Sequence, residues 1–465
     1  MGETNASALT DEQRGWVDAA SREEVNGWIY LRIGGEPFAR GFQHGYHVAD
    51  EFAEALAAYR FMTYEQFGVT FDFFTEAAVR MHKDKIGEEL TAELEGIAAG
   101  LTAAGVSVGL DDLIGWNAWM ELTDYWWPTV ADQYAKDQNQ GPRGSHCSGF
   151  VATGSATADG RIVIGHESFD EFWAGQYFNV MMDITPVEGH RLVMQTVPGY
   201  LGSMTDYWIT SAGLAVTETT IANFRGYAPD KTPEYVRARR ACQYATSIDE
   251  WVGLMHEGEN GGYANTWLLG DTKTNEIARY EEGLIYQKLD KLTDGAFFGC
   301  NAAFDPRIRN LEAVDTGFND PRQQTGARRQ RWMQLLDIYD GRIDVEIGKR
   351  MLADTYDPYL GYDNPSSRGI CSHYDVDPMH YASDPTAVWN VPFMPAGSVD
   401  GKVAAASDVE AMNMWGRVGR ADGVAFDAEE FVRQHPLWAW QAPYLKSRPS
   451  QPWTYFDQGD TLTQD

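Results

Sequence analysis

A cysteine with small neighbours is the residue of this chain best placed for covalent chemistry. Cys147 stands in the segment GSHCSGFVA at residues 144–152, directly after a stretch rich in Gly, Pro, Asn and Gln. Such residues favour an exposed connection over a packed element. A thiol at the end of that connection can attack the peptide bond before it, and the α-amine released by the cut can then act as its base. The alternative is that Cys147 is a small buried hydrophobe, the usual place of a free cysteine.

Composition limits the partners and the compartment. Of 465 residues, 43% are hydrophobic, which is enough for a sizeable core, while 37 Lys and Arg against 68 Asp and Glu give a net charge of −31. This charge repels phosphate backbones and anionic membrane surfaces, so we expect neither nucleic acid nor a membrane as partner. Four cysteines without paired spacing predict no disulfide framework. With no signal-like segment and no apolar run of membrane length, we expect a cytoplasmic protein.

The order of elements predicts an α+β protein. Residues 1–146 form a mainly helical segment after a short strand at 28–33, with apolar residues at helical spacing. From Cys147 to about Tyr286, β-rich runs dominate, interrupted by one helix at 233–245 and followed by another at 327–339. The tail is loop-rich with a helical stretch near 408–418. We therefore expect one compact unit in which residues 147–465 form a catalytic body of sheets covered by helices.

Several short motifs carry a family resemblance. They are HCS at 146–148, GHES at 165–168, PGYL at 198–201, SAGLAVTETT at 211–220, GYANTW at 262–267, CNAAF at 300–304, DPR at 320–322 and GSVDGKV at 397–403. In this order they resemble the phospholipase B-like family, whereas GFQHG at 41–45 and EGIAAGL at 95–101 resemble the related isopenicillin-N acyltransferase family. Both are N-terminal-nucleophile hydrolases. The resemblance implies a four-layer αββα core and a cysteine exposed by autocleavage.

Carried over by position, the resemblance assigns catalytic roles. It makes Cys147 the nucleophile, freed by scission after His146, and His166 the active-site histidine. It gives further catalytic roles to Thr220, Asn301 and Arg322. Without the resemblance, His166 has an ordinary explanation as a strand-end residue and Thr220 as a strand threonine. Asn301 is then an ordinary turn residue, and Arg322 is a surface charge.

Three further residues are predicted to bind substrate: Phe169, Asn265 and Glu218. At the position of Phe169 the lipase-like members have Trp, which leaves the shape of the acyl pocket open. An Asn or Thr donor can stabilise a tetrahedral oxyanion, and Asn265 is the second candidate for that role after Asn301. We expect no cofactor. We also expect no metal, because the cluster of His373, Asp375, Asp377 and His380 matches no metal-specific spacing.

The function predicted from these patterns is a self-processing cysteine hydrolase or acyltransferase acting on linear amides. Its partners are a small-molecule acyl substrate and its own N-terminal fragment; the oligomeric state stays open. Three alternatives stand beside it: a phospholipase B-like ester hydrolase, a ligand-binding scaffold without chemistry, and an unprocessed thiol hydrolase with His166 as base. A group of aromatic residues, if it lines the pocket, favours a compact apolar or aromatic acyl group: Trp116, Trp119, Trp126, Trp127, Phe169, Phe172 and Trp173.

Overall fold

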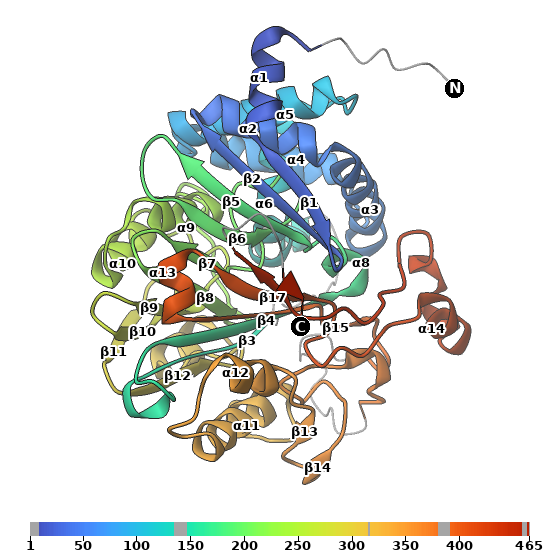
Figure 1. Cartoon of the computed structure of the whole chain (residues 1–465). Coiled ribbons are helices and arrows are strands. Elements are labelled where there is room, and N and C mark those ends of the chain that lie inside the picture. The colour runs from blue at the N-terminus through green and yellow to red at the C-terminus, as the bar shows by residue number, and fades with distance from the viewer. Residues whose placement is uncertain (1–8, 134–146, 315–316, 380–390, 458–462, 465) are drawn as a thin grey trace.

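Two large β-sheets organise the chain in the computed structural model (Figure 1). The structure describes residues 9–133, 147–314, 317–379, 391–457 and 463–464. The first sheet has the strand order β1-β2-β5-β6-β7-β8-β9-β10-β11, and all neighbours are antiparallel except β2 and β5. Its strands are β1 Ser21–Val25, β2 Trp28–Gly35, β5 Val180–Pro186, β6 Leu192–Thr196, β7 Trp208–Thr210, β8 Leu214–Thr220, β9 Asn265–Asp271, β10 Glu276–Glu282 and β11 Gln287–Leu292.

The second sheet contains the strand that starts at the cysteine. Its order is β12-β3-β4-β16-β17-β18-β19, with β15 also paired to β4, and every pair is antiparallel. Its strands are β3 Cys147–Thr153, β4 Val163–Glu171, β12 Gly295–Gly299, β15 Ala396–Ser398, β16 Asp400–Ala405, β17 Met414–Val418, β18 Thr454–Phe456 and β19 Thr463–Gln464. A separate hairpin joins β13 Tyr356–Asp357 to β14 Tyr362–Asp363.

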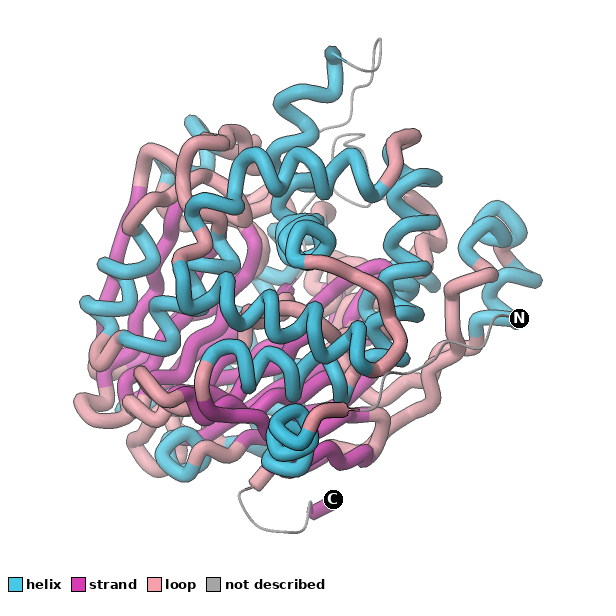
Figure 2. The backbone as a smooth tube through the Cα atoms, turned by 90° about the horizontal axis from the view of Figure 1, so that it is seen from above, coloured by secondary structure: helices cyan, strands magenta, loops and turns pink. Residues whose placement is uncertain are grey.

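Three apolar clusters show that the two sheets are stacked and covered by helices. Between the sheets, Val151 and Ile164 of the second pack against Leu268 of the first. The outer face of the first sheet is covered by helices α9 Glu234–Tyr244 and α10 Ile248–His256 through residues such as Trp251. Helices α11 Gln324–Ile338 and α12 Val345–Leu352 cover the second sheet, where Trp332 packs on β3. The layers are thus αββα, and the predicted fold class is confirmed. Figure 2 shows helices lying in front of the strands when the molecule is seen from above.

The segment before the cysteine supplies helices and also two strands. Its helices are α1 Asp11–Ala19, α2 Pro37–His47, α3 Ala49–Phe67, α4 Phe71–His82, α5 Glu88–Ala103, α6 Leu110–Glu121 and α7 Trp127–Val130. Strand β2 pairs in parallel with β5 along all but its first residue, from Ile29 opposite Val180 to Gly35 opposite Pro186. The segment is therefore part of the first sheet as well as a helical cover.

The tail is more ordered than its composition predicts. Beyond 390 it forms β15 to β18, which extend the second sheet, and helices α13 Ala406–Ala411 and α14 Ala428–Gln434. The helix expected near 408–418 is wrong in its second half: α13 ends at Ala411, and Met414 begins strand β17, which pairs with Phe456. Pairing with distant strands outweighs the local helical pattern there. The remaining short helix, α8 Phe172–Gly175, follows β4 directly.

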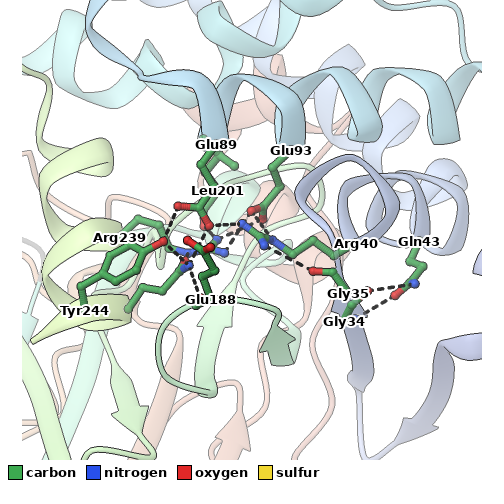
Figure 3. Close-up of polar contacts among 11 residues, drawn as sticks. Gly34, Gly35, Arg40, Gln43, Glu89, Glu93, Glu188, Leu201, Arg239 and Tyr244 are labelled. Atoms are coloured by element: carbon green, nitrogen blue, oxygen red, sulfur yellow. Dashed lines mark hydrogen bonds and ion pairs between the residues drawn. The ribbon is translucent and has the colours of Figure 1, made fainter. Parts of the chain in front are cut away.

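A buried ion network ties the helices before the cysteine to those after it (Figure 3). Glu93 on α5 accepts from Arg40 on α2 at 2.6 Å and from Arg239 on α9 at 3.1 Å, and all three side chains are buried. Arg239 also donates to the carbonyl of Leu201 at 2.6 Å. Buried charges are tolerated only when paired and hydrogen-bonded, so this network holds α2, α5 and α9 in one arrangement.

We expect Arg239→Met to lower the free energy of unfolding by roughly 3 kcal/mol, measured by urea denaturation. The loss falls at the low end for a broken buried pair because Arg40 still neutralises Glu93. Arg240→Met is the matched control: Arg240 stands next in the chain, is a third exposed, and pairs with the exposed Glu257 at 3.1 Å. Its loss should stay below about 1 kcal/mol. Equal losses for the two variants would contradict the structural role of the network.

Candidate active site

Cys147 is the first residue of β3, an inner strand between β12 and β4. Its side chain points between the sheets, on the same strand face as Val151, and is buried. Gly299, at the end of β12, allows the two sheets to approach closely here: a Cβ on it would lie 2.1 Å from the hydroxyl oxygen of Thr219 on β8. The cysteine is thereby placed against the first sheet at the point where β12 ends.

The thiol faces a carboxylate across the two sheets. Cys147 Sγ donates to Glu218 Oε1 on β8 at 3.1 Å, and the phenol of Tyr263 donates to the same oxygen at 3.2 Å. Burial, together with the charge of Glu218, raises the pKa of the Cys147 thiol well above its usual value. The thiol is therefore protonated in this state, and Glu218 is positioned to accept its proton.

Asn301 contacts the backbone nitrogen of the cysteine. Its Oδ1 accepts from the Cys147 N–H at 3.4 Å, and its Nδ2 donates to the carbonyl of Thr220 at 2.9 Å. Asn301 has φ of 61°, in the left-handed region that Asn tolerates better than most residues. The side-chain amide thus faces the atom that would become the α-amine after a cut before Cys147.

Arg328 on α11 completes the backbone contacts of the cysteine, and the sequence analysis missed it. Its Nη1 donates to the carbonyl of Cys147 at 2.8 Å and to Asn301 Oδ1 at 2.8 Å, and the side chain is fully buried. A signal was available: Arg328 precedes the buried Trp332 and Leu335 at helical spacing, which places an arginine on the inner face of the helix. Arg322, which was predicted instead, is exposed, pairs with Asp320 at 2.7 Å, and lies outside this cluster.

His166 lies on β4, the strand next to that of the cysteine, and Lys402 lies on β16, one strand farther along the sheet. A ring nitrogen of His166, Cys147 Sγ and a carboxylate oxygen of Glu218 all fall within 4.8 Å of one another. Burial, and then the charge of Lys402, lowers the pKa of His166 well below its usual value, so the imidazole is neutral. Lys402 lies within the GSVDGKV motif but was not predicted as a site residue. Its charge favours the thiolate form of Cys147, opposing the effect of Glu218.

Lys402 reaches the cysteine through its cross-strand neighbour. Ser168 on β4 lies opposite Cys147 in register and accepts from Lys402 Nζ at 2.9 Å. Lys402 also pairs with Asp400 at 2.7 Å, and Asp400 accepts from the Ser168 backbone N–H at 2.8 Å. Ser168 and Asp400 therefore hold the Lys402 ammonium in place, one strand beyond the neighbour of the cysteine strand.

The other predicted residues are distributed around this cluster. Thr220, at the end of β8, contributes its backbone carbonyl to Asn301. Asn265 lies opposite Thr220 in register at the start of β9, fully buried. Phe169 is buried with its ring 5.0 Å from the Arg328 guanidinium. His146 lies outside the described residues.

Among the residues that the structure describes, two groups of side chains have the donor types that a metal ion needs. The first is Cys147, His166 and Glu218. The second is Cys371, His373 and Asp422, where His373 Nε2 already hydrogen-bonds to Asp422 at 2.8 Å. In the first group the sulfur-to-oxygen distance of 3.1 Å is that of a hydrogen bond carrying the thiol proton. In each group, two of the three side chains are thus hydrogen-bonded to each other.

Four layers in the order αββα and a buried cysteine that begins an inner strand define the class of fold: a four-layer α+β sandwich, the arrangement that the family resemblance implies. The sequence profile described as Phospholipase B matches residues 12–297, more than half of the chain. The chain therefore belongs to the phospholipase B family, and the predicted resemblance is confirmed.

Two relatives and one solved structure give the extent of the similarity. An uncharacterized protein of Archaeoglobus fulgidus is 24% identical over 420 residues, covering 80% of this chain and 67% of its own. Putative phospholipase B-like 3 of Caenorhabditis elegans is 32% identical over 149 residues, covering 30% of this chain and 25% of its own. A mutant conjugated bile acid hydrolase from Clostridium perfringens matches with a TM-score of 0.36 and 10% identity, covering 69% of this chain and 96% of that one.

The matches to relatives named as phospholipases B are partial. The alignment spans a quarter of the nematode protein and 40% of the phospholipase B of Crotalus adamanteus. Within the described ranges, no helix has both the length and the apolar composition needed to cross a bilayer.

Proposed function

We propose that this chain is a self-processing cysteine hydrolase that cleaves amide bonds of acyl compounds or transfers the acyl group. The observation that supports it most is the set of contacts at Cys147: N–H to Asn301, carbonyl to Arg328 and thiol to Glu218. These three hold the nitrogen, the carbonyl and the sulfur of one residue, which an ordinary core cysteine does not need. Preorganised groups at the reacting atoms are what nucleophilic catalysis requires.

Self-processing would begin with the thiol of Cys147. Glu218 takes the thiol proton as the sulfur attacks the carbonyl carbon of His146. The C–N bond between His146 and Cys147 then breaks, and Glu218 gives that proton to the Cys147 nitrogen, which becomes an α-amine. A thioester then joins the carboxyl end of residues 1–146 to Sγ. Water hydrolyses it, leaving a new carboxylate and a free thiol. Asn301 Oδ1, already facing this nitrogen, accepts a hydrogen bond from the new amine.

Substrate turnover would use the same atoms. The α-amine takes the thiol proton as Sγ attacks the acyl carbonyl, and it returns that proton to the departing amine. Water resolves the acyl-enzyme in hydrolysis, whereas a second amine resolves it in acyl transfer. The charge of Lys402, held by Ser168 and Asp400, stabilises the thiolate during the attack.

A second candidate is ester hydrolysis of phospholipids. Family membership and the names of relatives such as the phospholipase B of Crotalus adamanteus favour it. The net charge of −31 opposes it, because the protein has no electrostatic attraction to an anionic bilayer. A thioester intermediate can form from an ester as well as from an amide, so the site chemistry alone allows both.

A substrate comparison tests the proposal. We expect soluble N-acyl amides with short aliphatic or aromatic acyl groups to be turned over faster than phospholipid vesicles, measured as amine released against fatty acid released. The reason is that substrate in solution meets no charge barrier. Fatty acid release from vesicles that is equal or faster, and lost in Cys147→Ala, would favour the ester hydrolase. No turnover of either, by an intact chain, would favour a binding scaffold.

A further inference from the structure

The second group of metal-ligand side chains lies on the side of the second sheet that faces α11 and α12, because Cys371 packs in the same apolar cluster as Trp332. Cys371, His373 and Asp422 each present one donor atom, and the three atoms fall within 4.8 Å of one another. Cys371 Sγ lies 3.8 Å from His373 Nε2, and Asp422 Oδ2 lies 2.8 Å from the same nitrogen. Three different donors thus converge at a place that the proposed mechanism does not use.

Two segments far apart in the sequence bring these side chains together. Cys371 and His373 stand two residues apart on a segment that pairs with β15 through a bridge from His373 to Gly397, and this spacing puts both side chains on one side of an extended chain. Asp422 follows β17, and its Oδ1 accepts from the Val424 N–H at 2.9 Å while Oδ2 faces the histidine. Because His373 and Asp422 are 49 residues apart in the chain, sequence spacing does not reveal the group.

The geometry fits a shared ion better than a catalytic relay. In a relay of cysteine, histidine and aspartate, the sulfur and the carboxylate contact different ring nitrogens, whereas here both face Nε2 of His373. Zinc bonds of about 2.3 Å to sulfur and 2.0 Å to nitrogen, at a tetrahedral angle, place these two atoms roughly 3.5 Å apart. The 3.8 Å between Cys371 and His373 is close to that distance. The Asp422 oxygen would have to withdraw by only about 0.5 Å to take its own tetrahedral position.

The residues for which the sequence predicted no metal are not the ones that converge. Of that group, His373 belongs to the cluster, whereas Asp375 pairs with Arg420 at 2.5 Å and Asp377 accepts two hydrogen bonds from a neighbouring serine. His380 lies outside the described residues. The absence of metal-specific spacing therefore does not bear on the donors that the fold brings together.

A further buried carboxylate lies beside the cluster. Glu167 on β4 is fully buried, and its Oε1 has no hydrogen-bond partner among the described residues. Its other oxygen accepts from the hydroxyl of Ser398 at 2.7 Å. Glu167 and Asp422 are the two carboxylates whose charges act most on the Cys371 thiol. A buried polar atom without a partner is costly, and a cation held by the cluster would supply one.

We propose that Cys371, His373 and Asp422 bind one zinc ion, with Glu167 beside its fourth position. A thiolate and an imidazole favour zinc, because magnesium and calcium take oxygen ligands. On binding, the thiol gives its proton to the solvent and the sulfur donates an electron pair to the metal, while the neutral imidazole binds through Nε2 and carries its proton on Nδ1. The thiolate and the Asp422 carboxylate together carry a charge of −2, which balances a divalent ion. The Asp422 side chain is 14% exposed, which gives the ion a way in.

The proposed ion would fasten the segment at 371–373 to the turn after β17. The site is separate from Cys147, so the proposal does not rest on the proposed function. Zinc should raise the midpoint of thermal unfolding of the wild type, because an ion that binds only the folded chain stabilises it.

Cobalt(II) reports directly on a sulfur ligand. The full chain, freed of metal with EDTA, is titrated with cobalt(II) and followed by absorption. We expect saturation at one equivalent, with a thiolate-to-cobalt charge-transfer band in the near ultraviolet and the visible bands of a tetrahedral ion. One equivalent of zinc should remove both. A titration without the charge-transfer band would overturn the proposal.

Three cysteine variants locate the ion. Cys371→Ala should abolish the charge-transfer band and weaken zinc binding by more than about a hundredfold, measured by competition with a chromophoric chelator. Cys147→Ala and Cys242→Ala remove equally buried thiols and should keep the band and the affinity. The Cys147 variant is also needed because Cys147, His166 and Glu218 form the first group of metal-type donors. A band lost in that variant and kept in Cys371→Ala would place the ion at the first group and overturn the proposal.

Asp422→Asn keeps the test valid if Cys371→Ala fails to fold. The amide retains the oxygen that accepts from Val424 but loses the charge, so this variant should fold and should bind zinc about tenfold more weakly. Circular dichroism checks the fold of each variant. Equal zinc affinity in the wild type and in the folded variants would mean adventitious binding to the surface of a chain with net charge −31, and would overturn the proposal.

Discussion

Cys147→Ala is expected to abolish both scission of the chain and turnover of any acyl substrate. The variant lacks the sulfur that forms the thioester in the proposed mechanism, and alanine fits the buried site because it is smaller than cysteine. Mass spectrometry of the intact protein should give two chains for the wild type, residues 1–146 and 147–465, and one chain for the variant. The two wild-type chains should elute together in gel filtration because β2 remains paired with β5.

The control for this variant is Cys242→Ala. Cys242 is equally buried, on α9, and its sulfur accepts from the indole of Trp251 at 3.3 Å. That variant should be cut and active, so a general effect of removing a buried thiol is separated from a chemical one. Activity that survives in Cys147→Ala would remove the residue from the mechanism. An intact but active wild type would favour the unprocessed hydrolase with His166 as base.

Asn301→Ala should lower turnover by roughly two to three orders of magnitude, the usual effect of losing one polar group at the reacting atoms. The amide oxygen holds the Cys147 nitrogen at 3.4 Å and is itself bonded to Arg328 at 2.8 Å. Its loss leaves the nitrogen without its acceptor and the guanidinium without one of its partners. The measurement is single-turnover acylation, after mass spectrometry has shown how far the variant is cut.

The φ of 61° at Asn301 calls for a second variant. Alanine is strained in this backbone region, whereas glycine is not. Asn301→Gly therefore removes the amide while keeping the turn. Equal losses in both variants support a role for the side chain. Normal turnover in Asn301→Gly would assign the effect of alanine to the backbone and move the oxyanion role to Asn265.

The sequence predicted the parts of the fold that local patterns control. The strand runs from Cys147 to Glu282 correspond to β3 to β10, because the β-rich runs and the glycine turns between them are adjacent in the chain. Strands β15 to β18 were missed, since each is short and is stabilised by a distant partner, as when Lys402 pairs with His166. Such pairing leaves no local signature.

In the candidate site too, residues in local motifs were predicted, whereas residues brought in by distant elements were missed. Cys147, His166, Glu218 and Asn301 come together in the structure, and each stood in a short motif. Arg322 was predicted from its motif, but the guanidinium that contacts Cys147 is that of Arg328. Arg328 belongs to no such motif, and only its position on the buried face of α11 distinguishes it from other arginines. Lys402 reaches the cysteine through register between strands far apart in sequence.

The parallel pairing of β2 with β5 has a consequence for refolding. Before a cut at Cys147, the two strands belong to one chain, and their meeting during folding is a first-order event. After the cut, the nine-stranded sheet contains strands from two separate chains. Recovery from denaturation then becomes second order, and the midpoint of thermal unfolding depends on protein concentration. A protein cut at Cys147 would thus be a heterodimer, and its two chains could not refold by the first-order step that formed the sheet before the cut.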